Sequence, residues 1–526
     1  MDFMQQLENE LLGSRHNTSV TENGAVGYRT TGKNLLDLNF AVASLRGASE
    51  SEIVERFKAA FLEDKVLAMK WLFFARDVRG GLGERRLFRT AMKFVAGYEP
   101  GIIKSLIPLI PEYGRFDDLW VLLDNTHLYP VIIEFIKKQL CKDNKDMLAN
   151  KPISLLAKWL PSANASSRIT KERARIIRSG LHMSERAYRR LLSHLRSYID
   201  VVEIKMSAKR WGEIDYEAVP SRANLIYKDA FLANDKDRRM KYLLKLENGE
   251  AKINAETLYP YDIVHKYVAI KAKSIYGERI GSKIFQYDPA IEALWKNLPN
   301  FVKGDNSTIV VADGSGSMRC CVGNSSVTAL EVANSLAIYF AEHLSGQFKN
   351  KYITFSERPQ LVDFNKCETL KDKLSIARLH NEVANTNIEA VFNLILNTAM
   401  TNKLSQNEIP KNILIISDME FDTCASYTSL PARHNLAYKK NLFKAIEERF
   451  CIAGYKIPRL VFWNVNSRTN TIPVRENEMG VALVSGFSVN ICKMVLSGKT
   501  DPFECLLETL NSERYQSIEK YLGYRR

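Results

Sequence analysis

The sequence predicts an α plus α/β multidomain protein, with an α-helical repeat module over residues 1–300 and a doubly wound parallel sheet over residues 301–526. In the first part, apolar side chains recur at helical spacing in medium-length segments with short connections. In the second part, short β-branched runs alternate with helical segments, as in a parallel sheet covered on both faces. The 526 residues are 46% hydrophobic and 25% charged, which excludes disordered and collagen-like chains.

The helices of the first part are recognised by apolar spacing and by the residues that cap them. Ser184 is a suitable N-cap for a strongly basic helix, and Pro220 with Ser221 suits the start of another. Pro108 and Pro111 mark a break within an apolar segment. In chain order, helices are expected at residues 51–61, 64–75, 102–110, 131–140, 171–177 and 184–198, and again from residue 220.

In the second part, short apolar runs typical of strands alternate with segments whose apolar residues follow helical spacing. Strands are expected at residues 307–312, 351–355, 412–417, 459–465 and 481–485, and helices at residues 327–344, 388–400, 436–450, 488–496 and 502–521. In such a sheet, ligands bind at the carboxyl ends of the strands. Asp313 and Asp418 each follow a strand at this position.

Basic residues are concentrated in one stretch of the first part. The chain has a net charge of +14, and residues 151–210 alone carry 14 basic and 4 acidic side chains. A local excess of this kind attracts polyanions, of which nucleic acid is the commonest. The alternative is a solvated basic face without a partner.

Composition also indicates the compartment. No apolar run reaches the length of about 18 residues that a membrane span requires. The first residues carry neither a basic start nor an apolar core, so we expect no secretory signal. The 8 cysteines show no CxxC spacing, which favours neither a disulfide framework nor a zinc site. We therefore expect a reducing, cytoplasmic location and no membrane partner.

A carboxylate and two hydroxyls follow the first strand of the second part. The sequence Asp313-Gly314-Ser315-Gly316-Ser317 presents them on a tight loop, Thr386 opens a later helix, and Asp418 ends the next long apolar strand. Hard oxygen ligands of this type suit Mg²⁺ best, with Mn²⁺ or Ca²⁺ as alternatives. Glu420 and Asp422 lie just beyond, as outer-shell charges or, the reading we favour, as solvated loop acids.

These five residues match, position by position, the metal-ion-dependent adhesion site of von Willebrand factor A domains. The resemblance covers about residues 305–490. It implies that Ser315, Ser317 and Thr386 offer hydroxyls to the ion, and that Asp313 and Asp418 act directly or through water. It also implies one open coordination position for an acidic residue of a protein partner.

Basic side chains that could hold RNA fall into a glycine-rich segment and a basic region. In residues 76–86, four arginines accompany three glycines, which lets a backbone approach phosphates that arginine grips. The alternative is an interhelix turn whose arginines pair with nearby acids. Trp159, Tyr188, Tyr198 and Trp211 are interleaved and could stack on bases, although such aromatics more often belong to a core. The candidate RNA-binding residues are Arg76, Arg79, Arg85, Arg86, Lys158, Arg168, Lys171, Arg175, Arg178, Arg186, Arg189, Arg190, Arg196, Lys209 and Arg210.

A basic helical module followed by this metal-site domain resembles the Ro autoantigen (TROVE) family. That resemblance implies HEAT-like repeats closed into a ring that binds small noncoding and misfolded RNAs. Local motifs are more similar to an uncharacterised group from plants, fungi and large DNA viruses. They include residues 74–86, 113–119, 157–162, 207–211 and 417–422.

The predicted function is an RNA-binding scaffold with a metal-dependent partner-binding domain, and not an enzyme. No Ser/His/Asp order stands out, and the 8 histidines lie away from motif nucleophiles. The first alternative is a metal-dependent interaction or assembly protein, viral in origin, that binds no RNA. The second is a metal-dependent nuclease that uses Asp313 and Asp418.

Overall fold

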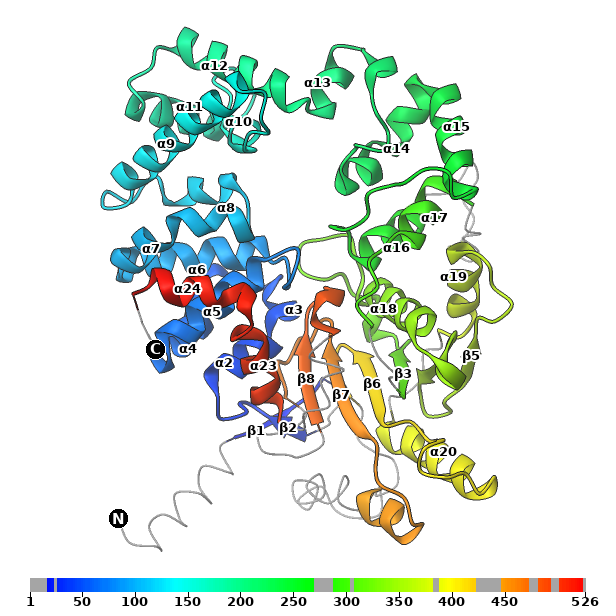
Figure 1. The fold of residues 1–526 in the computed structure, drawn as a ribbon. Coiled ribbons are helices and arrows are strands. Elements are labelled where there is room, and N and C mark those ends of the chain that lie inside the picture. The colour runs from blue at the N-terminus through cyan, green and yellow to red at the C-terminus, as the bar shows by residue number, and fades with distance from the viewer. Residues whose placement is uncertain are drawn as a thin grey trace, which may run out of the picture. The chain divides into compact units, whose positions relative to one another are not determined.

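The chain forms two compact units, each built from two separate stretches (Figure 1). One unit, called here the sheet unit, comprises Met1–Glu52 and Leu258–Thr509; the other, the helical unit, comprises Ile53–Thr257 and Leu510–Arg526. The computed structural model describes residues 17–22, 26–268, 287–302, 307–381, 387–421, 446–472, 481–492 and 501–523. These units do not coincide with the two sequence blocks 1–300 and 301–526.

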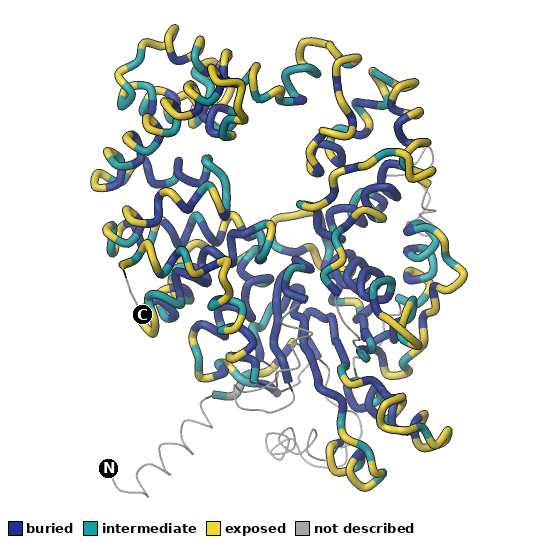
Figure 2. The backbone as a smooth tube through the Cα atoms, in the orientation of Figure 1, coloured by how far each residue is buried: buried dark blue, intermediate teal, exposed yellow. Residues whose placement is uncertain are grey.

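A six-stranded sheet of order β5-β4-β3-β6-β7-β8 forms the centre of the sheet unit. All neighbouring strands are parallel except β5, which pairs antiparallel with β4 at one edge. The strands are β3 (Thr308–Asp313), β4 (Lys351–Phe355), β5 (Leu361–Asp363), β6 (Asn412–Ser417), β7 (Arg459–Asn464) and β8 (Val481–Ser485). Figure 2 shows β3, β4, β6, β7 and β8 as largely buried, as expected for a sheet covered on both faces, whereas the edge strand β5 is exposed at Leu361 and Asp363.

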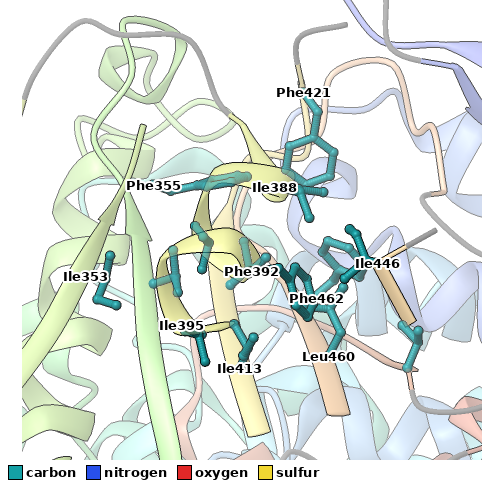
Figure 3. Packing of buried hydrophobic residues seen from close by; sticks show 14 of the residues in the cluster. Ile353, Phe355, Ile388, Phe392, Ile395, Ile413, Phe421, Ile446, Leu460 and Phe462 are labelled. Carbon is teal, nitrogen blue, oxygen red and sulfur yellow. The ribbon is translucent and has the colours of Figure 1, made fainter. Parts of the chain in front are cut away.

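Helices cover the two faces of this sheet. On one face, α20 (Ile388–Thr401) contributes Phe392 to a core with strand residues such as Phe355 and Phe462 (Figure 3). Side chains that alternate with these point to the other face. There, Trp463 of β7 contacts Phe340 of α18, with ring centroids 5.6 Å apart. Helix α18 (Ala329–His343) begins with a capping box in which Thr328 and Glu331 each bond the other's backbone.

The remaining described elements of the sheet unit flank this core. They are α2 (Asn34–Phe40), α3 (Val42–Leu45), α16 (Pro260–Val268), α17 (Pro289–Lys296), α19 (Leu370–Leu379), α23 (Pro502–Leu510) and the short helices η4 (Ser317–Arg319), η5 (Gly346–Phe348) and η8 (Val489–Ile491). Residues 446–452 are also helical. His265 of α16 lies 2.8 Å from Glu331 Oε2 and so joins α16 to the start of α18.

The first fifty residues are part of the sheet unit, although the sequence predicts them within the helical module. Strands β1 (Thr18–Val20) and β2 (Val26–Tyr28) form an antiparallel hairpin. Phe40 belongs to the apolar core of the sheet, and its carbonyl accepts a hydrogen bond from Asn464 Nδ2 at 2.9 Å. These contacts join segments more than 400 positions apart, which local sequence patterns do not reveal.

The helical unit consists of helices with short connections, which confirms the helical character predicted for this region. They are α4 (Glu50–Glu63), α5 (Lys65–Arg76), α6 (Arg85–Tyr98), α7 (Pro100–Leu106), α8 (Ile110–Tyr113), α9 (Tyr129–Leu148), α10 (Leu156–Trp159), α11 (Arg168–Gly180), α12 (Glu185–Ile199), α13 (Val202–Ser207), α14 (Ser221–Asn234), α15 (Lys236–Glu247) and α24 (Glu513–Tyr521). The short helices η1 (Ile107–Leu109), η2 (Phe116–Leu122) and η3 (Trp211–Glu213) connect some of them. Ser184 caps α12 as predicted, accepting a hydrogen bond from the Ala187 N–H.

The C-terminal helix α24 is an integral part of the helical unit. Its Arg514 forms a bidentate pair with the buried Asp77, and Tyr515 donates a 3.0 Å hydrogen bond to the same carboxylate. Lys70 of α5, which is also buried, donates to Glu519 Oε2 at 2.6 Å. The predicted single helix over residues 502–521 is therefore wrong, because α23 ends at Leu510 and α24 begins three residues later.

Most of the predicted strands and helices are confirmed within a few residues. The helix predicted at residues 436–450 and the end of that at 488–496 lie largely outside the described residues. Among the described helices, none combines the length and apolar character needed to cross a membrane.

Candidate functional site

The candidate metal site lies where two neighbouring strands of the sheet end. Asp313 is the last residue of β3, and Asp418 directly follows β6, which pairs with β3 in parallel register. From β3 the chain continues outward to β4 and β5, then returns to β6 on the other side. The carboxyl ends of β3 and β6 therefore form the topological switch point, where open α/β sheets bind ligands.

Hydrogen bonds hold the loop after β3 in a fixed conformation. The two oxygens of Asp313 accept from the Ser315 N–H at 2.9 Å and from the Ser417 hydroxyl at 2.6 Å. The Oγ atoms of Ser315 and Ser317 lie 3.0 Å apart. Gly314 allows this packing, because an added Cβ would lie only 3.1 Å from Asn381 Cα. The loop thus brings the Ser315 and Ser317 hydroxyls together and holds the Asp313 carboxylate in place.

The electrostatics of the site are set by two buried carboxylates. Asp313 and Asp418 each have 1% of their surface exposed. Burial, followed by repulsion from Asp418, raises the pKa of Asp313 to about 7. Burial also raises the pKa of Asp418, opposed by the charge of Arg468 and by a hydrogen bond from Ser317. Such a pair favours an additional positive charge between or beside its members.

Arg468 supplies a positive charge that the sequence did not single out. Its Nη1 lies 3.2 Å from Asp418 Oδ2 and 3.4 Å from the Ser317 carbonyl, and its Nη2 lies 2.7 Å from Glu22 Oε2. The hydrogen bond from Arg468 lowers the pKa of Glu22. Arg468 follows β7 by four residues, and Glu22 follows β1, so no local motif connects either to the Asp-x-Ser-x-Ser loop.

Glu420 is a buried structural acid and not the solvated loop residue that we favoured. It accepts hydrogen bonds from the backbone N–H groups of Glu22 at 2.9 Å, Arg468 at 2.7 Å and Thr469 at 2.9 Å. It therefore connects the N-terminal hairpin and the loop after β7 to the end of β6. Asp422 lies outside the described residues.

The donor set fits a hard divalent cation. Asp313, Ser315, Ser317 and Asp418 all offer oxygen, whereas Thr386 lies outside the described residues. Within the described ranges, no group of three or more His, Cys, Asp or Glu side chains is placed to hold a metal. The candidate site has two carboxylates, and its other donors are hydroxyls, so it does not count as a group of this kind. Cys320 and Cys321, beside the loop, are exposed and free.

Most of the candidate RNA-binding residues are exposed. In α12, Tyr188, Leu192 and Leu195 are buried, whereas Arg186, Arg189 and Arg190 are exposed. Within the part of the chain that the structure describes, no carboxylate pairs with Arg186, Arg189 or Arg190. The exposed members of the set are Arg79, Arg85, Arg86, Arg168, Lys171, Arg175, Arg186, Arg189, Arg190, Lys209 and Arg210, and those of intermediate exposure are Lys158, Arg178 and Arg196.

Two arginines of the set are occupied inside the helical unit. Arg76 is buried, and its Nε lies 2.8 Å from Asp118 Oδ2. Arg196 donates to the carbonyls of Ala157 at 2.8 Å and Leu160 at 2.6 Å. Both side chains therefore stabilise the helical unit and lie outside the exposed basic surface.

Other members form ion pairs at the surface. Arg175 pairs with Glu172, Arg210 with Glu213, and Lys158 with Glu203 at 3.7 Å. Ion pairs between exposed side chains are weak and contribute little to stability. They leave the basic character of the surface largely intact.

Gly81 of the segment 76–86 and two of the interleaved aromatics, Tyr188 and Trp159, make structural contacts, whereas Tyr198 is exposed and Trp211 is of intermediate exposure. An added Cβ at Gly81 would lie 1.9 Å from the Phe74 carbonyl oxygen, so this glycine permits a close turn after α5. Tyr188 is buried, and its hydroxyl donates to the Pro161 carbonyl at 2.9 Å. The Arg115 guanidinium lies over the Trp159 ring, 4.0 Å from its centroid.

The fold and the site together define an α plus α/β protein with an oxygen-rich site at the switch point of a mixed sheet. Residues 307–520 match the model of a domain of unknown function, DUF7788, and residues 21–108 and 166–304 match that of another, DUF2828.

Two individual proteins are also similar. The uncharacterised protein L728 of Acanthamoeba polyphaga mimivirus is 28% identical, with 94% of this chain and 87% of that protein covered. The crystal structure of the Ro (RSR) protein of Deinococcus radiodurans covers 90% of this chain and 93% of its own, with 10% identity and a TM-score of 0.32.

Proposed function

We propose that this protein is a Ro-like RNA-binding scaffold that holds structured or misfolded noncoding RNA on its helical unit. The observation that carries the proposal is the exposed arginine face of α12, formed by Arg186, Arg189 and Arg190. These residues follow helical spacing, so their guanidinium groups project from one side of the helix. Mutual repulsion between unpaired cations is relieved when a polyanion neutralises them.

Helix α11 extends the same kind of surface. Arg168 and Lys171 are exposed at its start, and Ala174 and Ile177 are buried on its other side. Arginine suits phosphate because its planar group donates two parallel hydrogen bonds. The ligand class we infer is therefore RNA held mainly through its backbone, with small noncoding or misfolded RNAs as the expected partners.

The sheet unit has a second role in this proposal. Asp313, Ser315, Ser317 and Asp418, joined by Thr386, would hold Mg²⁺ or a similar ion in the manner of a von Willebrand factor A domain. The bound ion would supply an open coordination position for a carboxylate of a protein partner. Ser315 and Ser317 hold each other's hydroxyls in place, and Ser417 holds the Asp313 carboxylate. Arg468 offsets the charge of Asp418.

We propose no catalytic activity. The candidate site combines two carboxylates, one of them paired with Arg468, with serine hydroxyls, a donor set better suited to binding an ion and a partner than to hydrolysis. A nuclease reading requires RNA cleavage that depends on Mg²⁺ or Mn²⁺ and is abolished by Asp313→Ala. Incubation of labelled RNA with the purified protein and each ion measures this directly.

Binding of a structured RNA with a single-stranded tail, measured over a range of salt concentrations, tests the RNA proposal. Charge reversal of Arg186, Arg189 and Arg190 to Glu removes three phosphate contacts. We expect weaker binding and a slope of log K against log salt that is smaller by about 2 to 3.

The matched control reverses three exposed lysines of α15 in the same unit, Lys236, Lys241 and Lys245. It changes the net charge equally and should retain most of the binding. Equal losses in both variants would indicate a net-charge effect without a defined surface. No binding by the wild type at low salt would overturn the proposal and favour the metal-dependent interaction or assembly protein instead.

A further inference from the structure

The Arg468 guanidinium lies between two carboxylates of different character. One is Asp418, which is buried at the end of β6, and the other is Glu22, whose side chain is 49% exposed. Each carboxylate contacts a different terminal nitrogen, at 3.2 Å and 2.7 Å respectively. The guanidinium therefore has two carboxylate partners, one inside the candidate metal site and one at its margin, besides the Ser317 carbonyl.

The backbone of Arg468 is fixed without help from its side chain. Its N–H donates to Glu420 Oε1 at 2.7 Å, and Asn464 Oδ1 accepts from the N–H groups of Asn466 and Ser467 just before it. The side chain can therefore change partner while the loop stays in place.

Glu22 is anchored beside Arg468 by equally short contacts. Its N–H donates to Glu420 Oε2 at 2.9 Å, and the preceding Thr21 hydroxyl donates to the Phe421 carbonyl at 2.7 Å. Both residues of the pair are thus attached through their backbones to one buried carboxylate, Glu420. This arrangement keeps Glu22 within reach of Arg468 whichever partner the guanidinium takes.

We propose that Arg468 is an internal counter-cation that competes with a divalent ion for Asp418, and that Glu22 receives the guanidinium when the ion binds. The proposal rests on the metal site described above. A divalent ion held by Asp418 and Ser317 would face the positive guanidinium at short range, and this repulsion weakens binding. Glu22 lowers the cost of moving Arg468 away, because it stabilises the charge in the displaced position.

Two substitutions should therefore change metal affinity in opposite directions. Mn²⁺ binding to the full-length chain can be followed by the electron paramagnetic resonance signal of the free ion. Arg468→Met removes the competitor, so Mn²⁺ should bind about tenfold more tightly or better. Glu22→Gln removes the alternative partner, commits the guanidinium to Asp418 and should weaken Mn²⁺ binding. The double variant should behave like Arg468→Met alone, since Glu22 then has no cation to receive.

The matched control is Lys373→Met, which removes a partly buried cation paired with Glu342 in the same unit. It should leave the affinity unchanged, and Asp313→Asn should abolish binding. If wild type and Arg468→Met bind Mn²⁺ equally, the role of Arg468 is disproved while the metal site stands. If neither binds, both proposals fail. Glu22→Gln, which alters a half-exposed side chain, provides an independent answer should Arg468→Met not fold.

Discussion

Asp313 and Asp418 place two acids in a sheet interior that solvates charge poorly. In the metal-free chain, Asp313 responds by retaining its proton well above the ordinary carboxyl range, with a pKa of about 7. Arg468 offsets the charge of Asp418 but does not contact Asp313 directly in the described contacts. The two buried carboxylates are thus neutralised separately, Asp313 by a proton and Asp418 by the Arg468 guanidinium, whereas a divalent ion would neutralise both.

This arrangement predicts a pH dependence of stability in the presence of EDTA. Between the ordinary pKa of 3.8 and about 7, the folded chain keeps a proton that the unfolded chain has released. The free energy of unfolding should therefore fall as pH rises through this window, by up to about 1.4 kcal/mol per pH unit, and level off above it. Asp313→Asn should lack this component. Denaturation at several pH values measures it, and identical profiles for the two proteins would contradict the assignment.

Substitutions of arginines within residues 151–210 should fall into two groups, one that lowers stability and one that lowers RNA binding. Arg196→Met leaves two backbone carbonyls and the Ser162 hydroxyl without their donor and should cost about 2 kcal/mol of stability. Arg190→Met, at an exposed position, should change stability by no more than about 0.5 kcal/mol. Thermal or urea denaturation compares them. RNA binding should show the opposite order when measured on folded protein, and a destabilised Arg190→Met would refute the division.

At the scale of elements, α24 is attached to α5 by a buried ion pair. Among the described contacts, Glu519→Met leaves the Lys70 ammonium, 2% exposed, with the Asn511 side-chain carbonyl as its remaining partner, and should destabilise the helical unit by about 3 kcal/mol. Lys70→Met combined with Glu519→Met should recover much of this loss, since no buried charge then remains unpaired. Urea denaturation of the single and double variants, followed by circular dichroism of the helices, gives the coupling energy between Lys70 and Glu519. If the stability losses of the two single variants simply add in the double variant, the buried ion pair is contradicted.

Strands and helices with a strong local pattern could be predicted from the sequence. Very short strands, and contacts between segments far apart in the chain, could not. The strand ending at Asp313 and the helix capped by Ser184 follow from apolar spacing and capping. Strands β1, β2 and β5 have three residues each, too few for a periodic signal.

The same division applies to the candidate site. The Asp-x-Ser-x-Ser loop and Asp418 are recognisable because each follows an apolar strand. Arg468 and Glu22 are not, because only the packing of the N-terminal hairpin against Glu420 brings them together. Burial of Arg76 likewise depends on Asp118, 42 positions away.

At the scale of the whole molecule, neither unit is a continuous piece of chain. A fragment of residues 301–526 lacks α2, α16 and α17, and loses the contact of Phe40 with the sheet core. We expect this fragment to be unstable alone, with broad or absent thermal unfolding, and to gain stability when residues 1–52 and 258–300 are restored. A cooperative transition for the fragment, equal to that of the sheet unit in the full chain, would contradict the division into units.

The interleaving of the two units also orders events during synthesis on the ribosome. The Ala43 N–H donates to the Ser485 hydroxyl, 442 positions later, so the first helices emerge long before their partner strand exists. Chains usually fold domain by domain from the N-terminus as they are made. Here most of the helical unit is translated while the opening segment is still without its sheet, and α24 can complete that unit only after the sheet strands have been made. Apolar residues of the opening segment, Phe40 among them, therefore remain without the strands that they pack against until most of the chain has been made.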